Sequence, residues 1–273
     1  MRVVLAAARS SPGVTTAMLA CASVWPGRVL LVEACEDGGA LAARFGRPVE
    51  PGLTTLAAAS RHATSSDARA DLLSQHLQPL PGTERIVALV GPVSLEPAQA
   101  LLRTAASRLA ELLVEADGDV LIDVGRLPAA PLARPLIERA DRLLLVVRPR
   151  VEELTALANR LPHLRALGPA PQLLLVGHQP YGPVEVADTL GVPVLGVLAH
   201  DPRAADALAA VASSRRLGRS QLLRTAGGIV DGLLRDGEAR SETSASFADA
   251  SERVNGQPAD TPRRRLLAGR SRA

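Results

Sequence analysis

Short apolar runs recur along the chain and are separated by longer stretches rich in Ala and Leu. Most of the runs are continuously apolar and do not alternate with polar residues, which is typical of strands buried on both faces of a sheet. These runs predict strands at residues 2–8, 28–33, 85–91, 119–125, 142–149, 172–177 and 193–199. The stretches between them predict helices at residues 15–24, 66–78, 95–116, 131–139, 151–167, 184–190, 203–212 and 218–235.

Alternating strands and helices predict an α/β fold, in which a mostly parallel sheet of about seven strands carries helices on both faces. Ligands of such sheets bind beyond the carboxyl ends of the strands. We therefore expect four loops that follow strands to meet at one edge of the sheet, namely residues 9–14, 33–39, 124–127 and 177–182.

The alternation ends near residue 236, where the chain becomes polar, rich in Ser, Ala and Asp, and without periodicity. We expect one domain over residues 1–235 and a disordered tail over 236–273, because such a composition buries too little apolar surface to fold. The basic end of the tail, 263–272, is either solvated or in weak contact with an anionic membrane or nucleic acid. The arginine-rich stretch 213–220 leaves a similar choice between a solvated helix start and a contact with DNA or an acidic partner.

Leu, Val and Ala must build the core, since 47% of the residues are hydrophobic but only 1% are aromatic. The scarcity of aromatic side chains weakens any hypothesis of nucleic-acid binding through stacked bases. The formal net charge is +3, and every Lys or Arg position holds Arg, because the chain contains no lysine. Hence no lysine ammonium can contact the phosphates of a nucleotide, as it does in ordinary phosphate-binding loops.

The two cysteines, Cys21 and Cys35, flank no metal-ligand pattern, and we expect both to be buried thiols. His178 and His200 follow two predicted strands, and we favour loop histidines over a metal-binding pair. No apolar run is long enough to span a membrane. We therefore expect a cytoplasmic protein, which a partner could recruit to a membrane or a cell pole.

Residues 9–16, RSSPGVTT, join the first predicted strand to the first predicted helix and have the outline of a phosphate-binding loop. In a strand–loop–helix unit, backbone N–H groups and the helix N-terminus face an anion. Gly13 allows the backbone to approach closely, Thr15 is placed to hold Mg²⁺ through its hydroxyl, and Thr16 can touch an α-phosphate.

Other residues of the loop count against an ordinary phosphate site. Pro12 removes one N–H donor, and Ser10 and Ser11 restrict the backbone more than glycines would. Val14 is the serious departure, because it stands where such loops normally keep a lysine and it carries no charge.

Six stretches follow one another along the chain: RSSPGVTTA, VLLVE, VLIDVG, ADRLLLVVRP, LLLVG and LGVPVLGVLAHDPRAADAL. In this order they resemble the MinD/ParA family of deviant-Walker ATPases, over residues 2–212. The middle part, from GLTTLAAAS to SRLAELL, is similar to the pilus-assembly branch called CpaE/TadZ and to actinobacterial septum-site proteins. The resemblance implies a P-loop NTPase fold, ATP or ADP with Mg²⁺ as ligands, a homodimer, and protein partners in a pilus, secretion or division machine.

The resemblance to the family is mixed at single positions. It implies that Mg²⁺ is held by Thr15 and Asp123, in a nucleotide site made of Arg9, Ser10, Ser11, Pro12, Gly13, Val14, Thr15, Thr16 and Tyr181. Arg9 matches the family's signature lysine, and Val14 matches its second lysine. Asp123 matches the Walker B aspartate, with a structural carboxylate that caps the loop as the alternative. Tyr181 lies where the family often contacts the adenine, with an exposed turn residue as the alternative.

The family follows its second strand with an Asp-x-Asp pattern, whose second Asp helps to position the attacking water. Here the pattern is Glu33-Ala34-Cys35, so a thiol stands at that position. Catalysis of phosphoryl transfer depends mainly on positioning and charge, so losing the lysine and this acid removes two of its main parts. We therefore expect a degenerate member with impaired or absent ATP hydrolysis, no catalytic residue, and a role as a scaffold or spatial regulator.

Two other functions stay open on the sequence alone. One is an active ATPase that uses Arg9, or an arginine of a second copy, and switches between a monomer and an ATP-bound dimer to position cargo. The other is a DNA-binding partition protein that uses surface arginines. An unrelated α/β fold is a further alternative.

Overall fold

The computed structural model describes residues 1–63, 65–81, 83–209 and 217–237. The chain separates into two compact units, Met1–Leu233 and Leu234–Ala273, and the fold described below is that of the first unit. The predicted disordered tail with its basic end lies outside the described residues, except for residues 236 and 237, which continue a helix. Residues 213–216 of the arginine-rich stretch also lie outside them.

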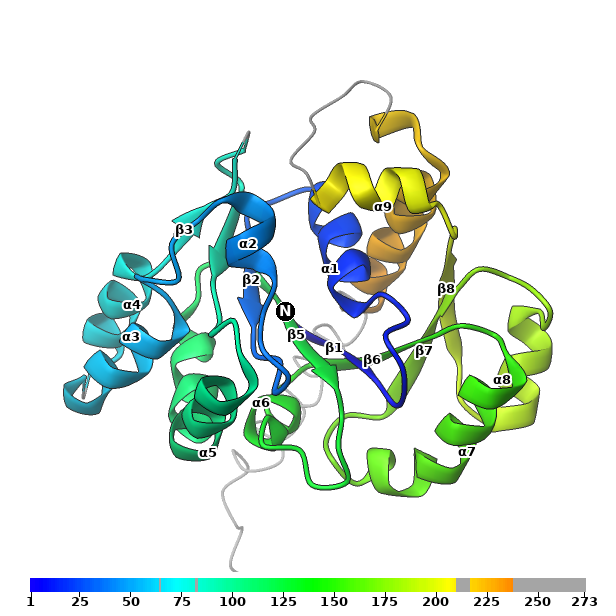
Figure 1. The fold of residues 1–273 in the computed structure, drawn as a ribbon, viewed down its shortest axis with the longest axis horizontal. Coiled ribbons are helices and arrows are strands. Elements are labelled where there is room, and N and C mark those ends of the chain that lie inside the picture. Colours follow the sequence, from blue (N-terminus) through cyan, green and yellow to red (C-terminus); the bar gives the residue numbers. More distant parts are fainter. Residues whose placement is uncertain (64, 82, 210–216, 238–273) are drawn as a thin grey trace, which may run out of the picture. The chain divides into compact units, whose positions relative to one another are not determined.

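Eight strands of the described chain form one sheet in the order β3-β4-β2-β5-β1-β6-β7-β8 (Figure 1). Neighbouring strands are parallel, apart from the antiparallel pair of β3 and β4. The strands are β1 (Arg2–Ala7), β2 (Val29–Glu33), β3 (Gln78–Pro79), β4 (Ile86–Leu89), β5 (Asp119–Arg126), β6 (Arg142–Val147), β7 (Pro171–Val176) and β8 (Val194–Leu198).

The helices are α1 (Val14–Ser23), α2 (Leu41–Phe45), α3 (Leu53–Ala59), α4 (Ser66–Gln75), α5 (Leu95–Leu112), α6 (Arg134–Glu138), α7 (Val151–Arg165), α8 (Pro183–Leu190) and α9 (Pro202–Ala209). A final helix covers residues 221–237, and single 3₁₀ turns cover Ser60–His62, Leu113–Glu115 and Leu217–Arg219. Figure 1 shows α1, α9 and the final helix, drawn in orange, on one face of the sheet, and α5, α6 and α7 on the other.

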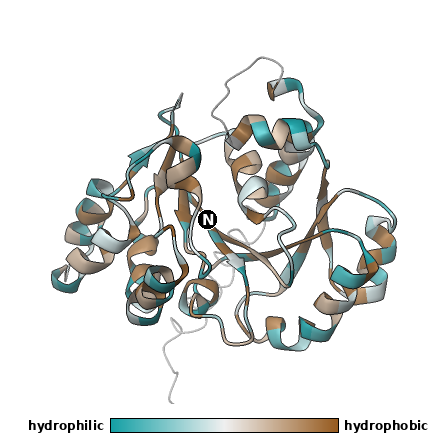
Figure 2. Ribbon diagram, in the orientation of Figure 1, coloured by the Kyte–Doolittle hydropathy of each residue, from teal (hydrophilic) through white to brown (hydrophobic). Residues whose placement is uncertain are grey.

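The core lies on both faces of the sheet, because successive side chains of a strand point to opposite sides. Val4, Ile122 and Leu145 belong to a large buried cluster that also contains leucines of α5 and α7. Their neighbours Leu5 and Leu121 are buried as well, and by this alternation they point to the opposite side of the sheet. Figure 2 shows hydrophobic residues along the strands and hydrophilic ones on outward helix surfaces. The continuously apolar strands therefore reflect burial on two faces, as the sequence predicts.

All seven predicted strands are present, each to within two residues at either end. The prediction of an α/β fold with a mostly parallel sheet is therefore confirmed. The extra strand β3 lies at the end of predicted helix 66–78, which in the structure stops at Gln75. A strand of two residues has no pattern of its own, and it forms here because Gln78 and Pro79 pair with Ala88 and Val87 of β4.

The final helix forms although Gly227 and Gly228 lower its intrinsic propensity. Packing on β8 offsets this cost. A side chain at Gly196 would meet Ile229 of the helix, so the glycine lets the helix approach the strand closely. The hydroxyl of Thr225 accepts a hydrogen bond from the backbone N–H of Ala199 at 3.0 Å.

Candidate functional site

Three of the four expected loops meet directly at the carboxyl edge of the sheet. The backbone N–H of Ala34, after β2, donates to the carbonyl of Asp123 in β5 at 2.8 Å. The N–H of Leu127, after β5, donates to the carbonyl of Ala7 at the end of β1 at 2.9 Å. The fourth loop starts at Gly177, whose N–H donates to the carbonyl of Leu198 at the end of β8.

The loop between β1 and α1 contains two residues with positive φ. Gly13 has φ = 105° and precedes the first residue of α1, a conformation that glycine adopts without the strain of a side chain. Ser10 has φ = 63°, which is uncommon for a residue with a side chain. The first turn of α1 contains no acidic residue and no side-chain cap, so its free N–H groups stay available for an anion.

Thr15 and Asp123 form the polar centre of the site. The hydroxyl of Thr15 donates to one carboxylate oxygen of Asp123 at 2.5 Å, and the N–H of Gly125 donates to the other at 2.8 Å. Asp123 is only 2% exposed. Burial raises the pKa of its carboxyl, while the hydrogen bonds from Thr15 and Gly125 act in the opposite direction.

The Thr15–Asp123 pair fits Mg²⁺ together with a nucleotide. A hydroxyl and a carboxylate are ligands that Mg²⁺ accepts, and it usually completes its shell with phosphate oxygens and waters. Among the described residues, no group of three or more His, Cys, Asp or Glu side chains could hold a metal ion. A cation at this pair would therefore depend on the phosphates of a bound nucleotide.

Val14 and Cys35, which stand beside the Thr15–Asp123 pair in sequence or space, carry no charge. The side chain of Val14 is 7% exposed and packs into the protein. Cys35 lies against Gly125, which has φ = 62°, so that a side chain at Gly125 would collide with the Cys35 sulfur. Burial raises the pKa of the Cys35 thiol to about 11. At neutral pH the group is an uncharged thiol, which cannot act as a carboxylate toward water.

Glu33, the first acid of the Glu33-Ala34-Cys35 stretch, has a structural role. Its carboxylate accepts hydrogen bonds from the backbone N–H groups of Ala40 at 2.6 Å, Leu41 at 2.9 Å and Gly91 at 3.2 Å. Burial raises its pKa, and these three bonds oppose the shift. The side chain thereby fixes the segment that leads from β2 into α2.

A hollow of about 230 Å³ lies beside the loop. The loop, the ends of β6, β7 and β8 and the start of α9 surround it, and its lining includes Pro12, Gly13, Thr16, Arg148, His200 and Asp201. The carboxylate of Asp201 accepts a hydrogen bond from the N–H of Ala204 at 3.0 Å and so caps α9. A base and sugar could lie here, with the phosphates directed along the loop toward Thr15.

The remaining predicted site residues lie elsewhere. Arg9, Ser10 and Ser11 are exposed on the loop. Tyr181 lines a groove of about 320 Å³ between α7 and α8, together with Leu154 and Val186, and it is not part of the hollow beside Gly13. The structure thus brings Pro12, Gly13, Thr15, Thr16 and Asp123 together and leaves Tyr181 apart.

Two arginines for which the sequence predicts no role in the site contact the loop or its start. Arg148, after β6, donates to the carbonyl of Ser11 at 3.3 Å. Arg160 of α7 donates to the carbonyls of Ala8 and Leu127, each at 2.5 Å, and to that of Pro128 at 2.8 Å. A guanidinium group bonded to three carbonyls ties α7 to the start of the loop and to the segment after β5.

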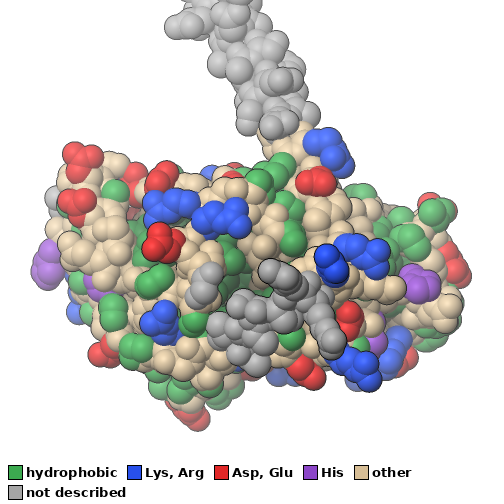
Figure 3. All heavy atoms as spheres, turned by 90° about the horizontal axis from the view of Figure 1, so that it is seen from above, with side chains coloured by type: hydrophobic (Ala, Val, Ile, Leu, Met, Phe, Trp, Pro, Cys, Tyr) green, Lys and Arg blue, Asp and Glu red, His purple; other side chains and the backbone are tan. Residues whose placement is uncertain are grey.

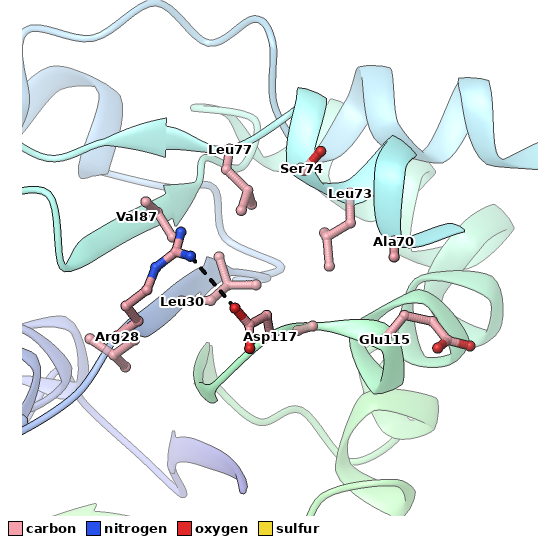
Figure 4. A pocket seen from close by; sticks show the side chains of 11 residues that line it. Arg28, Leu30, Ala70, Leu73, Ser74, Leu77, Val87, Glu115 and Asp117 are labelled. Carbon is pink, nitrogen blue, oxygen red and sulfur yellow. Dashed lines mark ion pairs between the residues drawn. The ribbon is translucent and has the colours of Figure 1, made fainter. Parts of the chain in front are cut away.

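Another hollow, of about 220 Å³, lies at the opposite, amino-terminal edge of the sheet, between α4 and the starts of β2 and β5 (Figure 4). Its walls include Leu30, Leu73 and Leu77, and its rim carries the ion pair of Arg28 and Asp117 at 3.6 Å. It is separated from the loop by the length of the strands.

Charge on one face of the molecule is mixed. Figure 3 shows the side that is uppermost in Figure 1, where basic and acidic side chains are interspersed over the described surface. No helix among the described residues is long and apolar enough to cross a membrane.

Comparisons with known proteins concern the fold. No family model matches the sequence, and no curated protein matches it. A ParA family ATPase from Chlorobium tepidum matches with a TM-score of 0.68 at 18% identity, over 85% of this chain and 97% of that one. The cell division ATPase MinD of Pyrococcus furiosus matches with a TM-score of 0.65 at 18% identity, over 86% and 98%. The septum site-determining protein MinD of Pyrococcus horikoshii, complexed with Mg-ADP, matches with a TM-score of 0.60 at 19% identity, over 85% and 95%. The chain therefore has the α/β fold of the MinD and ParA ATPases.

Proposed function

We propose that the protein binds a magnesium–adenine nucleotide at the loop 9–16, hydrolyses it weakly or not at all, and acts as a scaffold or spatial regulator. The observation that carries the proposal is the pair of Thr15 and Asp123 beside Gly13, with Val14 and Cys35 at the positions that need charge. The groups that hold a nucleotide and Mg²⁺ are present, whereas those that drive hydrolysis are not.

Nucleotide binding is supported by three features at one edge of the sheet. The loop presents the N-terminus of α1, Thr15 and Asp123 offer Mg²⁺ ligands, and the adjoining hollow is large enough for a base and sugar. The MinD structure from Pyrococcus horikoshii, which has this fold, contains Mg-ADP. ATP or ADP with Mg²⁺ is therefore the ligand that we propose.

Weak hydrolysis follows from the chemistry of two side chains. Val14 cannot stabilise the charge that develops on the phosphates, and the neutral Cys35 thiol cannot orient a water as a carboxylate would. Loss of one such group commonly lowers a rate by roughly 10²- to 10³-fold. Two losses in one site leave little turnover.

We propose a homodimer that recruits partners in a pilus, secretion or division machine, as the similarity of the middle segment to CpaE/TadZ and septum-site proteins suggests. An active ATPase that positions cargo, or a DNA partition protein, is the competing function. The mixed charge of the face in Figure 3 gives DNA binding through that face no specific support.

The test measures nucleotide affinity by calorimetry and phosphate release on the same protein. We expect Mg-ADP and Mg-ATP to bind, and phosphate release to equal that of the Asp123→Asn variant. Val14→Lys restores a charge and should strengthen Mg-ATP binding about tenfold. Val14→Leu, which introduces an uncharged side chain of similar size, is the control and should leave the Mg-ATP affinity unchanged.

Four measurements test the separate parts of the proposal. Absence of binding by the native chain would remove the nucleotide site. Steady phosphate release well above that of Asp123→Asn would establish an active ATPase. Light scattering with and without Mg-ATP tests the homodimer, and salt-dependent DNA binding would favour the partition function.

A further inference from the structure

Arg148 brings a positive charge to the loop from another strand. It follows β6, which is the neighbour of β1 on the side away from β5. Its guanidinium reaches across to the carbonyl of Ser11 at 3.3 Å, and its side chain lines the hollow with Gly13 and Thr16. It therefore lies where the loop meets the hollow that we propose for the base and sugar.

The charge of Arg148 is only loosely neutralised in the structure. Glu153 is the carboxylate that faces it, but the closest approach to the guanidinium is 4.0 Å, and Glu153 mainly accepts a hydrogen bond from the backbone N–H of Arg148 at 3.0 Å. The Nε of Arg148 is buried and has no hydrogen-bond partner. Two further carboxylates, Asp201 and Asp206, line the hollow, and Asp201 accepts a hydrogen bond from the N–H of Ala204. The Arg148 side chain is 33% exposed and lines the hollow beside the loop, so its loosely paired guanidinium is suited to an anionic ligand there.

We propose that Arg148 supplies the positive charge to the α- and β-phosphates of the nucleotide that Val14 cannot supply. This inference rests on the proposed function and names a further binding residue of the same site. The side of the loop on which Arg148 lies indicates which phosphates it would contact. Arg148 lies with Thr16 and His200 on the nucleoside side, whereas Thr15 and Asp123, which would hold Mg²⁺, lie toward β5.

This placement separates binding from hydrolysis. A charge on the α- and β-phosphates is present in both ATP and ADP and stabilises the bound ground state of each. Interactions that are equal in the ground state and the transition state do not accelerate a reaction. Arg148 would thus retain the nucleotide without restoring turnover, and ATP and ADP would gain equally from it.

The test compares affinities for Mg-ADP and Mg-ATP by calorimetry in four variants. Arg148→Gln removes the charge but keeps an amide donor, and it should weaken both nucleotides by about tenfold to a hundredfold. Arg148→Lys keeps a charge and should recover part of the loss. Arg150→Gln, two residues further on, removes an exposed arginine and is the matched control, with affinity within about twofold of native. Glu153→Gln keeps an acceptor for the Arg148 N–H but removes the opposing charge, and it should strengthen binding by about threefold.

The outcomes distinguish this inference from the proposed function. If the native chain binds neither nucleotide, the proposed function fails and the inference fails with it. If the native chain binds both, and Arg148→Gln binds as tightly as Arg150→Gln, only the inference is overturned. A loss confined to ATP also overturns it, since the charge would then act on the γ-phosphate. Thermal unfolding of each nucleotide-free variant checks that it is folded. If Arg148→Gln is unfolded, the affinity of Glu153→Gln decides instead. An affinity of Glu153→Gln equal to that of the native chain then counts against the inference.

Discussion

The hydroxyl of Thr15 lies 2.5 Å from a carboxylate oxygen of Asp123, although 108 positions separate the two residues in the sequence. The contact joins the first turn of α1 to β5. It forms because β1 and β5 are parallel neighbours, with Leu5 level with Asp123, so that the loop after β1 returns over the side chain of Asp123. The polar centre of the site is therefore a product of strand order.

Asp123 should make the stability of the protein depend on pH. Burial raises its pKa above the ordinary value of 3.8. Below that value the group is protonated in both the folded and unfolded states, but as the pH rises the folded state loses stability relative to the unfolded one. We expect Asp123→Asn to remove this loss, so that the variant gains on the native protein between pH 4 and pH 7 in urea unfolding.

The comparison with the native protein is needed because the pKa of Glu33 is raised as well and its ionisation contributes in the same direction. That contribution is present in both proteins and largely cancels. A stability difference between native and Asp123→Asn that is constant from pH 4 to pH 7 would contradict the prediction.

Glu33 should be a large contributor to stability. Glu33→Ala leaves the N–H groups of Ala40, Leu41 and Gly91 without their acceptor, and we expect a loss of about 2–4 kcal/mol in the free energy of unfolding. Glu33→Gln keeps one acceptor oxygen and should lose about half as much. Denaturation in urea measures both, and a loss under about 0.5 kcal/mol for Glu33→Ala would show that water replaces the carboxylate.

Cys35 should react slowly with alkylating reagents. Its pKa of about 11, against an ordinary 9.0, reduces the thiolate fraction at pH 8 by about a hundredfold. Cys21, with a pKa of about 12, should react more slowly still. Mass spectrometry of iodoacetamide adducts follows each thiol separately, with urea-unfolded protein as the reference. Labelling of Cys35 in the folded protein at the reference rate would show that the thiol is open to water.

The three carbonyl contacts of Arg160 should hold the loop in place. Arg160→Leu removes all three contacts and should lower the free energy of unfolding by about 2 kcal/mol. Hydrogen bonds from a charged donor contribute more than neutral ones, but the partial exposure of this site reduces their contribution. Arg160→Lys should lose about half of that. The neighbouring Asn159→Ala alters an exposed position of α7 and should change stability by less than about 0.5 kcal/mol.

The sequence predicts the sheet well and the site in part. Continuous apolar runs identify seven strands, most of which are buried on two faces although β4 and β8 are partly exposed, whereas β3 depends on pairing with β4 and has no local signal. The meeting of Thr15 and Asp123 follows from the parallel order of the strands. The contacts of Arg148 and Arg160 cannot be predicted from the strand order. Their long side chains reach carbonyls of loops that only the tertiary structure brings near.

The two-residue strand β3 has a consequence for self-association. It occupies one border of the sheet, it is short, and its second residue is Pro79, which has no N–H to offer to another strand. Such a border is a poor template for a chain that would add itself as a further strand. Copies of this protein that associate are therefore not expected to do so by continuing one sheet across β3 into the next molecule.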